Sequence, residues 1–287
     1  MTSRELLRAA ARELAAAGVP DPAYDAGQLL AKVTGMPALE LRAGFAEISA
    51  EQEAPFRALM DRRKAREPLQ YLLGDTVFLG RSFQVRPGVL IPRPETEMLA
   101  ENAIRWVRER SLRVPHPEVL DLCCGSGCIG LTVKAERPDA IVTLSDISRD
   151  ALDVAAANAA RYSLQVSLRC GDLAEGLPPA SFDCVVSNPP YIPSAECGVL
   201  QPEVLREPSL ALDGGADGMD FYRRISDECV RILRPDGILL LELGYGESDA
   251  VSFLLAAAGF TGITVRKDFS GIARMMLAVS PARRNYV

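Results

Sequence analysis

The sequence predicts an α/β protein in which a small N-terminal helical bundle precedes a doubly wound, mainly parallel sheet. Helical periodicity fills residues 1–75, strand-like apolar runs recur from residue 119 onward, and a glycine-rich stretch directly follows the first of these runs. We therefore expect a helical domain at residues 1–75, a β-hairpin linker at 76–92 and an α/β domain at 93–287.

The first two helices of the bundle carry end signals. Thr2 and Glu5 form a capping-box pair ahead of an apolar face with helical spacing. Asp21 followed by Pro22 is the pattern of an N-cap and a proline at the first helical position, and Gly35 ends this helix.

A longer helix is expected from Ser49 and Gln52, a second capping-box pair, to Arg66. Its last turn is basic, with Arg62, Arg63, Lys64 and Arg66. Such a cluster is most often a solvated face, with contact to a partner as the alternative. Because the bundle carries no chemistry of its own, we predict that it recognises the substrate of the α/β domain.

A cofactor fingerprint follows the first strand of the α/β domain. Residues 119–123 form a buried strand, and residues 125–130 fit G-x-G-x-x-G at the start of a helix that runs from 128 to 136. The next strand, residues 140–146, ends in Asp146, where a carboxylate can bind ribose hydroxyls. This half of the chain should bind a nucleoside-containing cofactor, and the fingerprint alone allows NAD or S-adenosylmethionine.

The most informative feature is Asn188-Pro189-Pro190-Tyr191, directly after an apolar strand at residues 182–187. Two prolines fix both φ angles and remove two backbone donors, so the loop offers carbonyl oxygens, the Asn188 amide and an aromatic ring. This combination suits a planar –NH2 group, either a carboxamide or the amine of a base. A proline turn with a capping Asn is the alternative.

The strand order decides between the two cofactors. Residues 165–169 form the third strand, ahead of Asp172, so residues 182–187 are the fourth and lie beside the first in a 3-2-1-4-5 sheet. Asn188 therefore lies next to the cofactor. A dehydrogenase would need a proton donor there, but the single histidine, His116, precedes the first strand and lies on the far side. We therefore predict a methyltransferase.

The remaining elements extend the sheet. A turn-rich insertion at residues 193–218 should border the site, followed by a helix at 220–233, a strand at 237–242 and a helix at 247–258. Two last strands, at 263–267 and 273–279, complete the 3-2-1-4-5-7-6 order of a Rossmann-like class I methyltransferase, whose closing pair is antiparallel.

Composition excludes several classes of protein. The 287 residues carry a net charge of −6, which argues against direct nucleic-acid binding. Seven cysteines without a C-x-x-C pair, and one histidine, argue against a metal site and a disulfide framework. No apolar run reaches membrane-spanning length and no signal peptide is visible, so we expect a soluble, cytoplasmic protein without membrane contact.

Three separated motifs resemble those of the protein-(glutamine-N5) methyltransferase family, and within it the release-factor enzymes. They are the tetrapeptide at 188–191, the segment Ile91-Pro92-Arg93-Pro94-Glu95-Thr96-Glu97, and the stretch from Glu207-Pro208-Ser209-Leu210-Ala211 to Arg223. The chain departs from the release-factor pattern at Cys123 and Cys124, where Gly-Thr is usual, and at Leu173, where many relatives carry an aromatic residue.

The resemblance implies an enzyme that methylates the glutamine of the Gly-Gly-Gln motif in peptide-chain release factors, its protein partners. We expect the Asn188 oxygen and the Pro189 carbonyl to accept the two N–H bonds of the substrate amide, with Pro190 and Tyr191 bordering it. The residues expected to bind S-adenosylmethionine are Cys123, Cys124, Gly125, Ser126, Gly127, Asp146, Asp172, Leu173 and Asn188.

Three alternative functions follow from the same residues. Cys123 resembles the sister enzymes that methylate a ribosomal protein, although the segment at residues 92–96 favours the release-factor enzymes. The tetrapeptide could also clamp a flipped adenine for N6-methylation, which the acidic charge disfavours. A non-catalytic cofactor-binding protein is disfavoured by the intact tetrapeptide.

Overall fold

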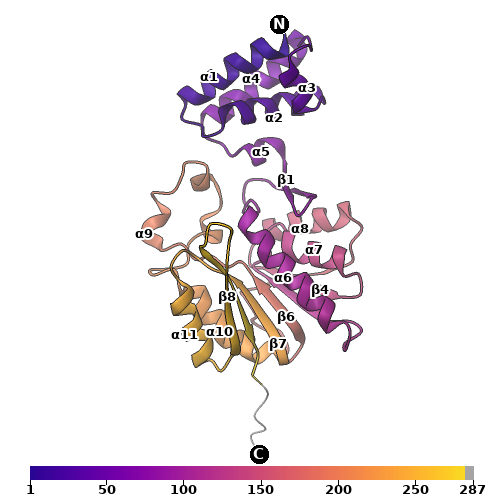
Figure 1. Ribbon diagram of the computed structural model, residues 1–287, viewed down its shortest axis with the longest axis vertical. Helices are drawn as coiled ribbons and strands as arrows, with labels where there is room; N and C mark the ends of the chain where they lie inside the picture. The colour runs from indigo at the N-terminus through magenta and orange to yellow at the C-terminus, as the bar shows by residue number, and fades with distance from the viewer. Residues whose placement is uncertain (282–287) are drawn as a thin grey trace, which may run out of the picture. The chain divides into compact units, whose positions relative to one another are not determined.

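The computed structural model describes residues 1–281 and forms two compact units (Figure 1). The first, the helical unit, comprises Met1–Thr76 together with the distant segment Leu200–Arg206. The second, the sheet unit, comprises Val77–Val199 and the chain from Glu207 onward.

The helical unit packs its helices around one apolar core. Its helices are α1 (Ser3–Ala16), α2 (Pro22–Thr34), α3 (Ala38–Ala43), α4 (Ala50–Lys64) and α5 (Leu69–Leu73). The core side chains with no exposed surface include Leu6, Leu14, Leu29, Leu30, Leu41, Phe56 and Met60. Burial of these apolar side chains, rather than helix propensity, holds such short helices together.

The predicted caps are mostly confirmed. Thr2 with Glu5, and Ser49 with Gln52, form complete capping boxes at α1 and α4. Asp21 precedes Pro22 as predicted, but its side chain makes no capping hydrogen bond, because its backbone ψ of 62° is far from the extended geometry of a capping residue.

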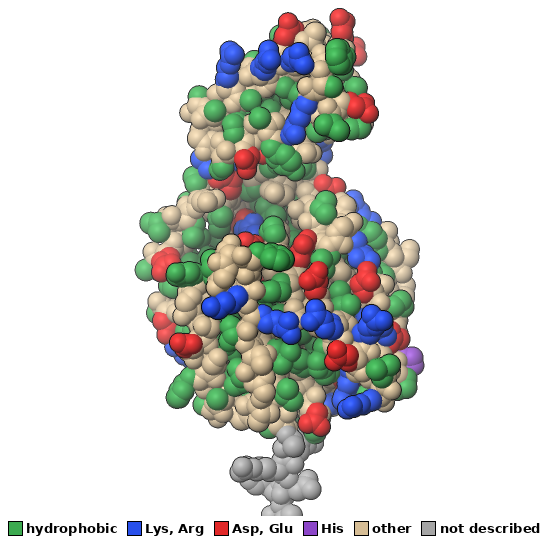
Figure 2. Space-filling view, viewed as in Figure 1, with side chains coloured by type: hydrophobic (Ala, Val, Ile, Leu, Met, Phe, Trp, Pro, Cys, Tyr) green, Lys and Arg blue, Asp and Glu red, His purple; other side chains and the backbone are tan. Residues whose placement is uncertain are grey.

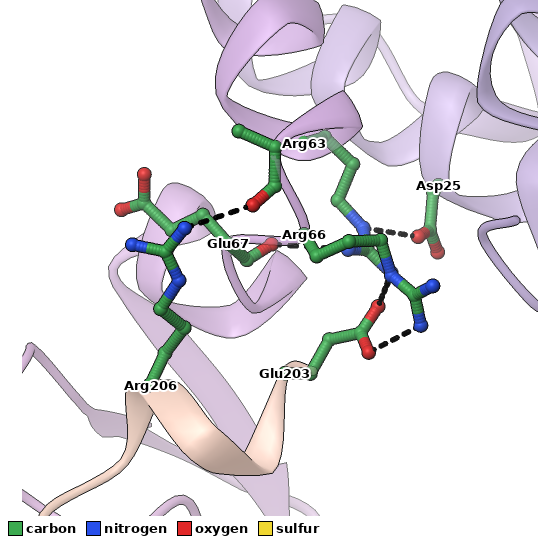
Figure 3. Close-up of polar contacts among 7 residues, drawn as sticks. Asp25, Arg63, Arg66, Glu67, Glu203 and Arg206 are labelled. Carbon is green, nitrogen blue, oxygen red and sulfur yellow. Dashed lines mark hydrogen bonds and ion pairs between the residues drawn. The ribbon is translucent and has the colours of Figure 1, made fainter. Parts of the chain in front are cut away.

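The basic cluster at the end of α4 was predicted as a solvated face, which is right for Arg62, 53% exposed, but wrong for Arg63. The Arg63 side chain is only 4% exposed and its Nε donates to Asp25 on α2 at 2.7 Å. Arg63 and Arg66 both donate to Glu203, with Arg66 using Nε at 2.6 Å and Nη2 at 2.5 Å on the two carboxylate oxygens (Figure 3). These bonds fasten the segment Leu200–Arg206 to the helical unit.

The sheet unit contains a seven-stranded sheet within the described residues. Its strands are β3 (Glu118–Leu122), β4 (Ile141–Asp146), β5 (Ser167–Cys170), β6 (Phe182–Ser187), β7 (Leu233–Glu242), β8 (Thr261–Lys267) and β9 (Ala273–Val279). The order β5-β4-β3-β6-β7-β9-β8 confirms the predicted arrangement, with β9 antiparallel to both neighbours. Two further strands, β1 (Asp75–Phe78) and β2 (Arg81–Gln84), pair separately as a hairpin.

Helices cover both faces of this sheet (Figure 1). One face packs against α6 (Pro94–Arg110), α7 (Cys128–Glu136) and α8 (Arg149–Arg161). The other packs against α10 (Asp220–Ile232) and α11 (Ser248–Ala257). Successive residues of a strand point to opposite faces of the sheet, so Val119 packs in the core on the first face and Leu120 in the core on the second. Short helical turns occupy the insertion after β6, at Ser194–Cys197, Val204–Arg206 and Ser209–Ala211.

The parallel strands end in one row. Leu122 of β3 pairs in register with Ser145 of β4 and Ser187 of β6, and Ser187 pairs with Leu241 of β7. Because the carboxyl ends of parallel strands share one edge, the residues that follow them meet there.

Candidate active site

A pocket of about 310 Å³ lies at this edge, within the sheet unit. Its volume is at the lower end of the range for small-molecule sites, about 300–1,000 Å³. Of the residues predicted for the site, those on its wall are Cys123, Cys124, Gly125, Ser126, Asp146, Asp172, Leu173, Asn188 and Pro190. Gly127, Pro189 and Tyr191 are not on the wall; Pro189 is buried, and Tyr191 packs against the core beneath α10 and α11.

The glycine loop has the backbone shape that its sequence predicts. Gly125 has a φ of 54°, and nothing lies within 4 Å of where its Cβ would be, so the backbone itself faces open space. Gly127 begins α7 with a φ of 77°. A Cβ on Gly130 would lie 2.9 Å from the Asp121 Cβ, which shows that this glycine lets α7 pack tightly on the sheet.

Asp146 holds the glycine loop while facing the pocket. Its Oδ2 accepts the backbone N–H of Gly125 at 2.8 Å, and its Oδ1 accepts that of Ser148 at 2.9 Å. Burial raises the pKa of Asp146, although these backbone bonds oppose the shift. A carboxylate can accept about four hydrogen bonds, so acceptor capacity is left for the hydroxyls of a ribose.

Asn188 is oriented by a residue from another element. Its Nδ2 donates to the Thr96 hydroxyl at 3.3 Å, and Thr96 is a buried residue on α6. The side-chain oxygen of Asn188 is thereby left as the acceptor that the amide presents. At the other end of the tetrapeptide, the Tyr191 hydroxyl donates to Oε1 of Glu242, the last residue of β7, at 3.2 Å.

Two of the motifs quoted above meet at one buried carboxylate. Glu207 is 6% exposed and accepts the backbone N–H of Ile91 at 3.0 Å and the Arg93 guanidinium at 2.5 Å. The residues that follow Glu207 and also line the pocket are Pro208, Leu210 and Ala211. This contact joins the segment before α6 to the insertion after β6, and it explains why both motifs border one site.

Several residues on the pocket wall were not predicted from the sequence, among them Thr96, Ile147, Phe221 and Arg224. Arg224 pairs with Asp172 at 2.9 Å. Phe221 and Arg224 lie within the helix that the sequence did predict, and their i, i+3 spacing puts them on one helical face. That spacing was a usable signal, and the motif at residues 91–97 pointed to the segment of Thr96 but not to this side chain.

Cys123 and Cys124 lie on the pocket wall as neutral thiols. Burial raises the pKa of both, and nearby aspartates raise it further. Cys123 adopts a φ of 60°, a left-handed conformation that suits glycine, so the loop takes this shape at a steric cost.

Other features of residues 1–281 bear on the class of site. No group of histidines, cysteines or carboxylates in that range has the arrangement of a metal site, and no helix there is long and apolar enough to cross a membrane. His116 lies before β3, where its Nδ1 is 3.1 Å from the Asp139 carbonyl, at the amino end of the strand. Acidic and basic side chains are intermixed on the face that Figure 2 shows.

Comparison with known proteins assigns both parts of the chain. The family profile described as PrmC N-terminal domain matches residues 5–74, and the profile described as Methyltransferase small domain matches residues 108–207. A release factor glutamine methyltransferase of Caulobacter vibrioides is 42% identical over 275 residues, which cover 94% of each chain. One of Gloeobacter violaceus is 43% identical over 276 residues, which cover 94% of this chain and 95% of that one.

The fold is shared more widely. A methyltransferase from Pyrococcus furiosus has a TM-score of 0.51 at 16% identity, over 79% of this chain and 98% of that one.

Proposed function

The chain belongs to the family of release factor glutamine methyltransferases, and we propose that it methylates the side-chain amide nitrogen of the glutamine in the Gly-Gly-Gln loop of peptide-chain release factors. The observation that carries the proposal is the position of Asn188. It lies on the wall of the same pocket as the glycine loop and Asp146, with its amide oxygen presented as an acceptor.

The proposed methyl donor is S-adenosylmethionine, which when bound supplies a sulfonium methyl already activated for transfer. The residues fit this group: Asp146 has spare acceptor capacity for ribose hydroxyls, and Gly125 exposes backbone where the amino-acid end would approach. Asp172 and the buried Leu173 would border the adenine, with Leu173 supplying an apolar rather than an aromatic surface.

The substrate amide needs orientation, because its nitrogen lone pair is delocalised into the carbonyl group. Asn188 Oδ1 and the Pro189 carbonyl would accept its two N–H bonds, which points the nitrogen at the methyl group and favours pyramidalisation. Positioning of this kind can contribute several kcal/mol, about 7–11 at its best. The acceptors also favour the positive charge that develops on nitrogen. Pro190, which lies on the pocket wall, would border the plane of the amide, whereas Tyr191 lies off the wall.

The helical unit would recognise the folded substrate. It exposes two large apolar side chains close together in sequence, Leu39 at 80% and Phe45 at 89%. Contiguous exposed apolar side chains mark interaction surfaces. We propose that they contact the release factor outside its Gly-Gly-Gln loop.

The test is methylation by the purified protein with labelled S-adenosylmethionine and three separate substrates: a release factor, a ribosomal-protein mixture and adenine-containing DNA. Mass spectrometry should find one added methyl group on the Gly-Gly-Gln glutamine of the release factor. Methylation of a ribosomal protein or of adenine instead would replace the proposed substrate. The variants Leu39→Ala and Phe45→Ala should raise KM for the intact release factor but leave activity on a short Gly-Gly-Gln peptide unchanged.

A further inference from the structure

Two residues outside the tetrapeptide each hold one of its ends. At one end, Asn188 donates to the Thr96 hydroxyl at 3.3 Å; at the other, Tyr191 donates to Glu242 at 3.2 Å. Thr96 and Glu242 are each 2% exposed and come from different elements, α6 and the end of β7. Glu242 follows Leu241, which pairs in register with Ser187, so the carboxyl group lies beside the start of the tetrapeptide.

The Glu242 carboxyl group holds the Tyr191 end of the tetrapeptide. Burial raises its pKa to about 7, and the bond from the Tyr191 hydroxyl lowers it. Its Oε1 accepts from Tyr191, whereas its buried Oε2 has no hydrogen-bond partner in the structure. A buried carboxyl oxygen without a partner costs stability, which suggests that the group has a function.

The direction of the Thr96 contact determines what Asn188 can do. The Thr96 hydroxyl oxygen accepts the Asn188 N–H, so the –NH2 side of the amide is turned toward Thr96. The Asn188 amide is then held with its oxygen toward the pocket. If the Asn188 amide were reversed, its –NH2 group would face the –NH2 group of the substrate amide, which would then lose an acceptor.

We propose that Thr96 and Glu242 are positioning residues for methyl transfer, which hold Asn188 with its oxygen toward the substrate amide and fix Tyr191 at the other end of the loop. This inference rests on the proposed function. Neither Glu242 nor Tyr191 lines the pocket, so Glu242 acts through its neighbours and not by touching the substrate.

Substitution of Thr96 tests the contact with Asn188. Thr96→Val keeps the shape but removes the hydroxyl, and kcat should fall roughly ten- to a hundredfold, less than the 10²–10³ typical for loss of a direct contact. KM for the release factor and the affinity for S-adenosylhomocysteine should change less than about threefold. Thr96→Ser should restore most of kcat. Thr132→Val is the matched control, because Thr132 is buried on α7 away from the pocket wall, and it should leave kcat unchanged.

The pH profile tests Glu242. The charged groups that act on its carboxyl are Glu95, which raises its pKa, and Arg274, which lowers it. The ionised form is the better acceptor, so the parental kcat should rise as the pH increases through about 7. Glu242→Gln should lower kcat and abolish that rise, while Thr96→Ser should retain it.

The outcomes separate the two proposals. If Asn188→Ala abolishes methylation while Thr96→Val and Glu242→Gln act at the parental rate with the parental pH profile, the positioning role is wrong and the proposed function stands. If the parental protein itself does not methylate the release factor, the proposed function fails. A loss of kcat in Thr96→Val that Thr96→Ser does not restore would also overturn the positioning role.

Discussion

Asp146 has two tasks in this structure, and they can be separated. It anchors the glycine loop through Gly125 and Ser148, and we propose that it also binds the cofactor ribose. Asp146→Asn keeps the size of the side chain but replaces one acceptor oxygen by a donor –NH2 group. The amide can satisfy only one of the two backbone N–H groups, and it offers fewer acceptors to the ribose.

The expected loss of affinity follows from these bonds. A hydrogen bond to a charged group is worth about 1.5–3 kcal/mol, and about 1.4 kcal/mol is a factor of ten in affinity. Loss of one ribose bond should therefore lower the affinity for S-adenosylhomocysteine about ten- to a hundredfold. Asp146→Ala should lower this affinity further, because it also removes both hydrogen bonds that anchor the loop.

Calorimetry with two ligands distinguishes the ribose contact from the loop contact. Asp146→Asn should lower the affinity for S-adenosylhomocysteine much more than the affinity for its 2′,3′-dideoxy analogue, which lacks the ribose hydroxyls that Asp146 would bind. Asp139→Asn is the matched control, because Asp139 precedes the other end of β4, and it should leave both affinities unchanged. If Asp146→Asn weakens both ligands by the same factor, Asp146 only holds the loop and the assignment to the ribose is wrong.

Three further changes have defined outcomes. Asn188→Ala should lower kcat by about 10²–10³ while cofactor affinity stays within about threefold, and Asn188→Asp, which keeps an oxygen acceptor, should retain some activity in the same turnover assay. Although partial burial raises the pKa of Glu203, the bonds from Arg66 and Arg63 lower it to about 2. This contact should therefore stabilise the protein fully above about pH 4.5, and the stabilisation should be lost as the pH falls through about 2. Glu203→Gln should raise the rate of amide hydrogen exchange in Leu200–Arg206 at neutral pH. Gly130→Ala should lower the free energy of unfolding by about 1–3 kcal/mol in urea titrations, because the added methyl group overpacks α7 against the sheet.

Local patterns were enough to predict most of the sheet. The strand at residues 182–187 and the last strand, residues 273–279, have the predicted bounds, because their apolar runs end at clear turn or polar signals. The helix Pro94–Arg110 was not predicted, although Thr96, Leu99, Ala100, Ala103 and Val107 are buried at helical spacing. Its polar composition hid that spacing, so the signal was present but weak.

The candidate site was predictable to the extent that it follows from topology. Once the glycine loop, Asp146 and Asn188 are placed at strand ends, the fold must bring them to one edge. Thr96 could not be identified in this way, because its role depends on how α6 packs against the loop after β6, 92 residues later in the chain. Side-chain contacts of this kind are set by packing and leave no periodic trace in the sequence.

The ion pairs of Glu203 show why the boundaries of the two units could not be predicted from the sequence alone. Arg63 and Arg66 precede Glu203 by 140 and 137 residues, and either arginine alone would look like part of a solvated helix end. Glu207, four residues after Glu203, is buried in the other unit against Ile91 and Arg93, so the chain is held by a carboxylate on each side of the boundary. Removal of the helical bundle would therefore also strip Leu200–Arg206 of its partners, and this segment directly precedes in sequence the pocket residues that begin at Pro208. Loss of activity in such a fragment would not by itself prove a recognition role, which is better tested by substitutions at Leu39 and Phe45 that leave the Glu203 contacts intact.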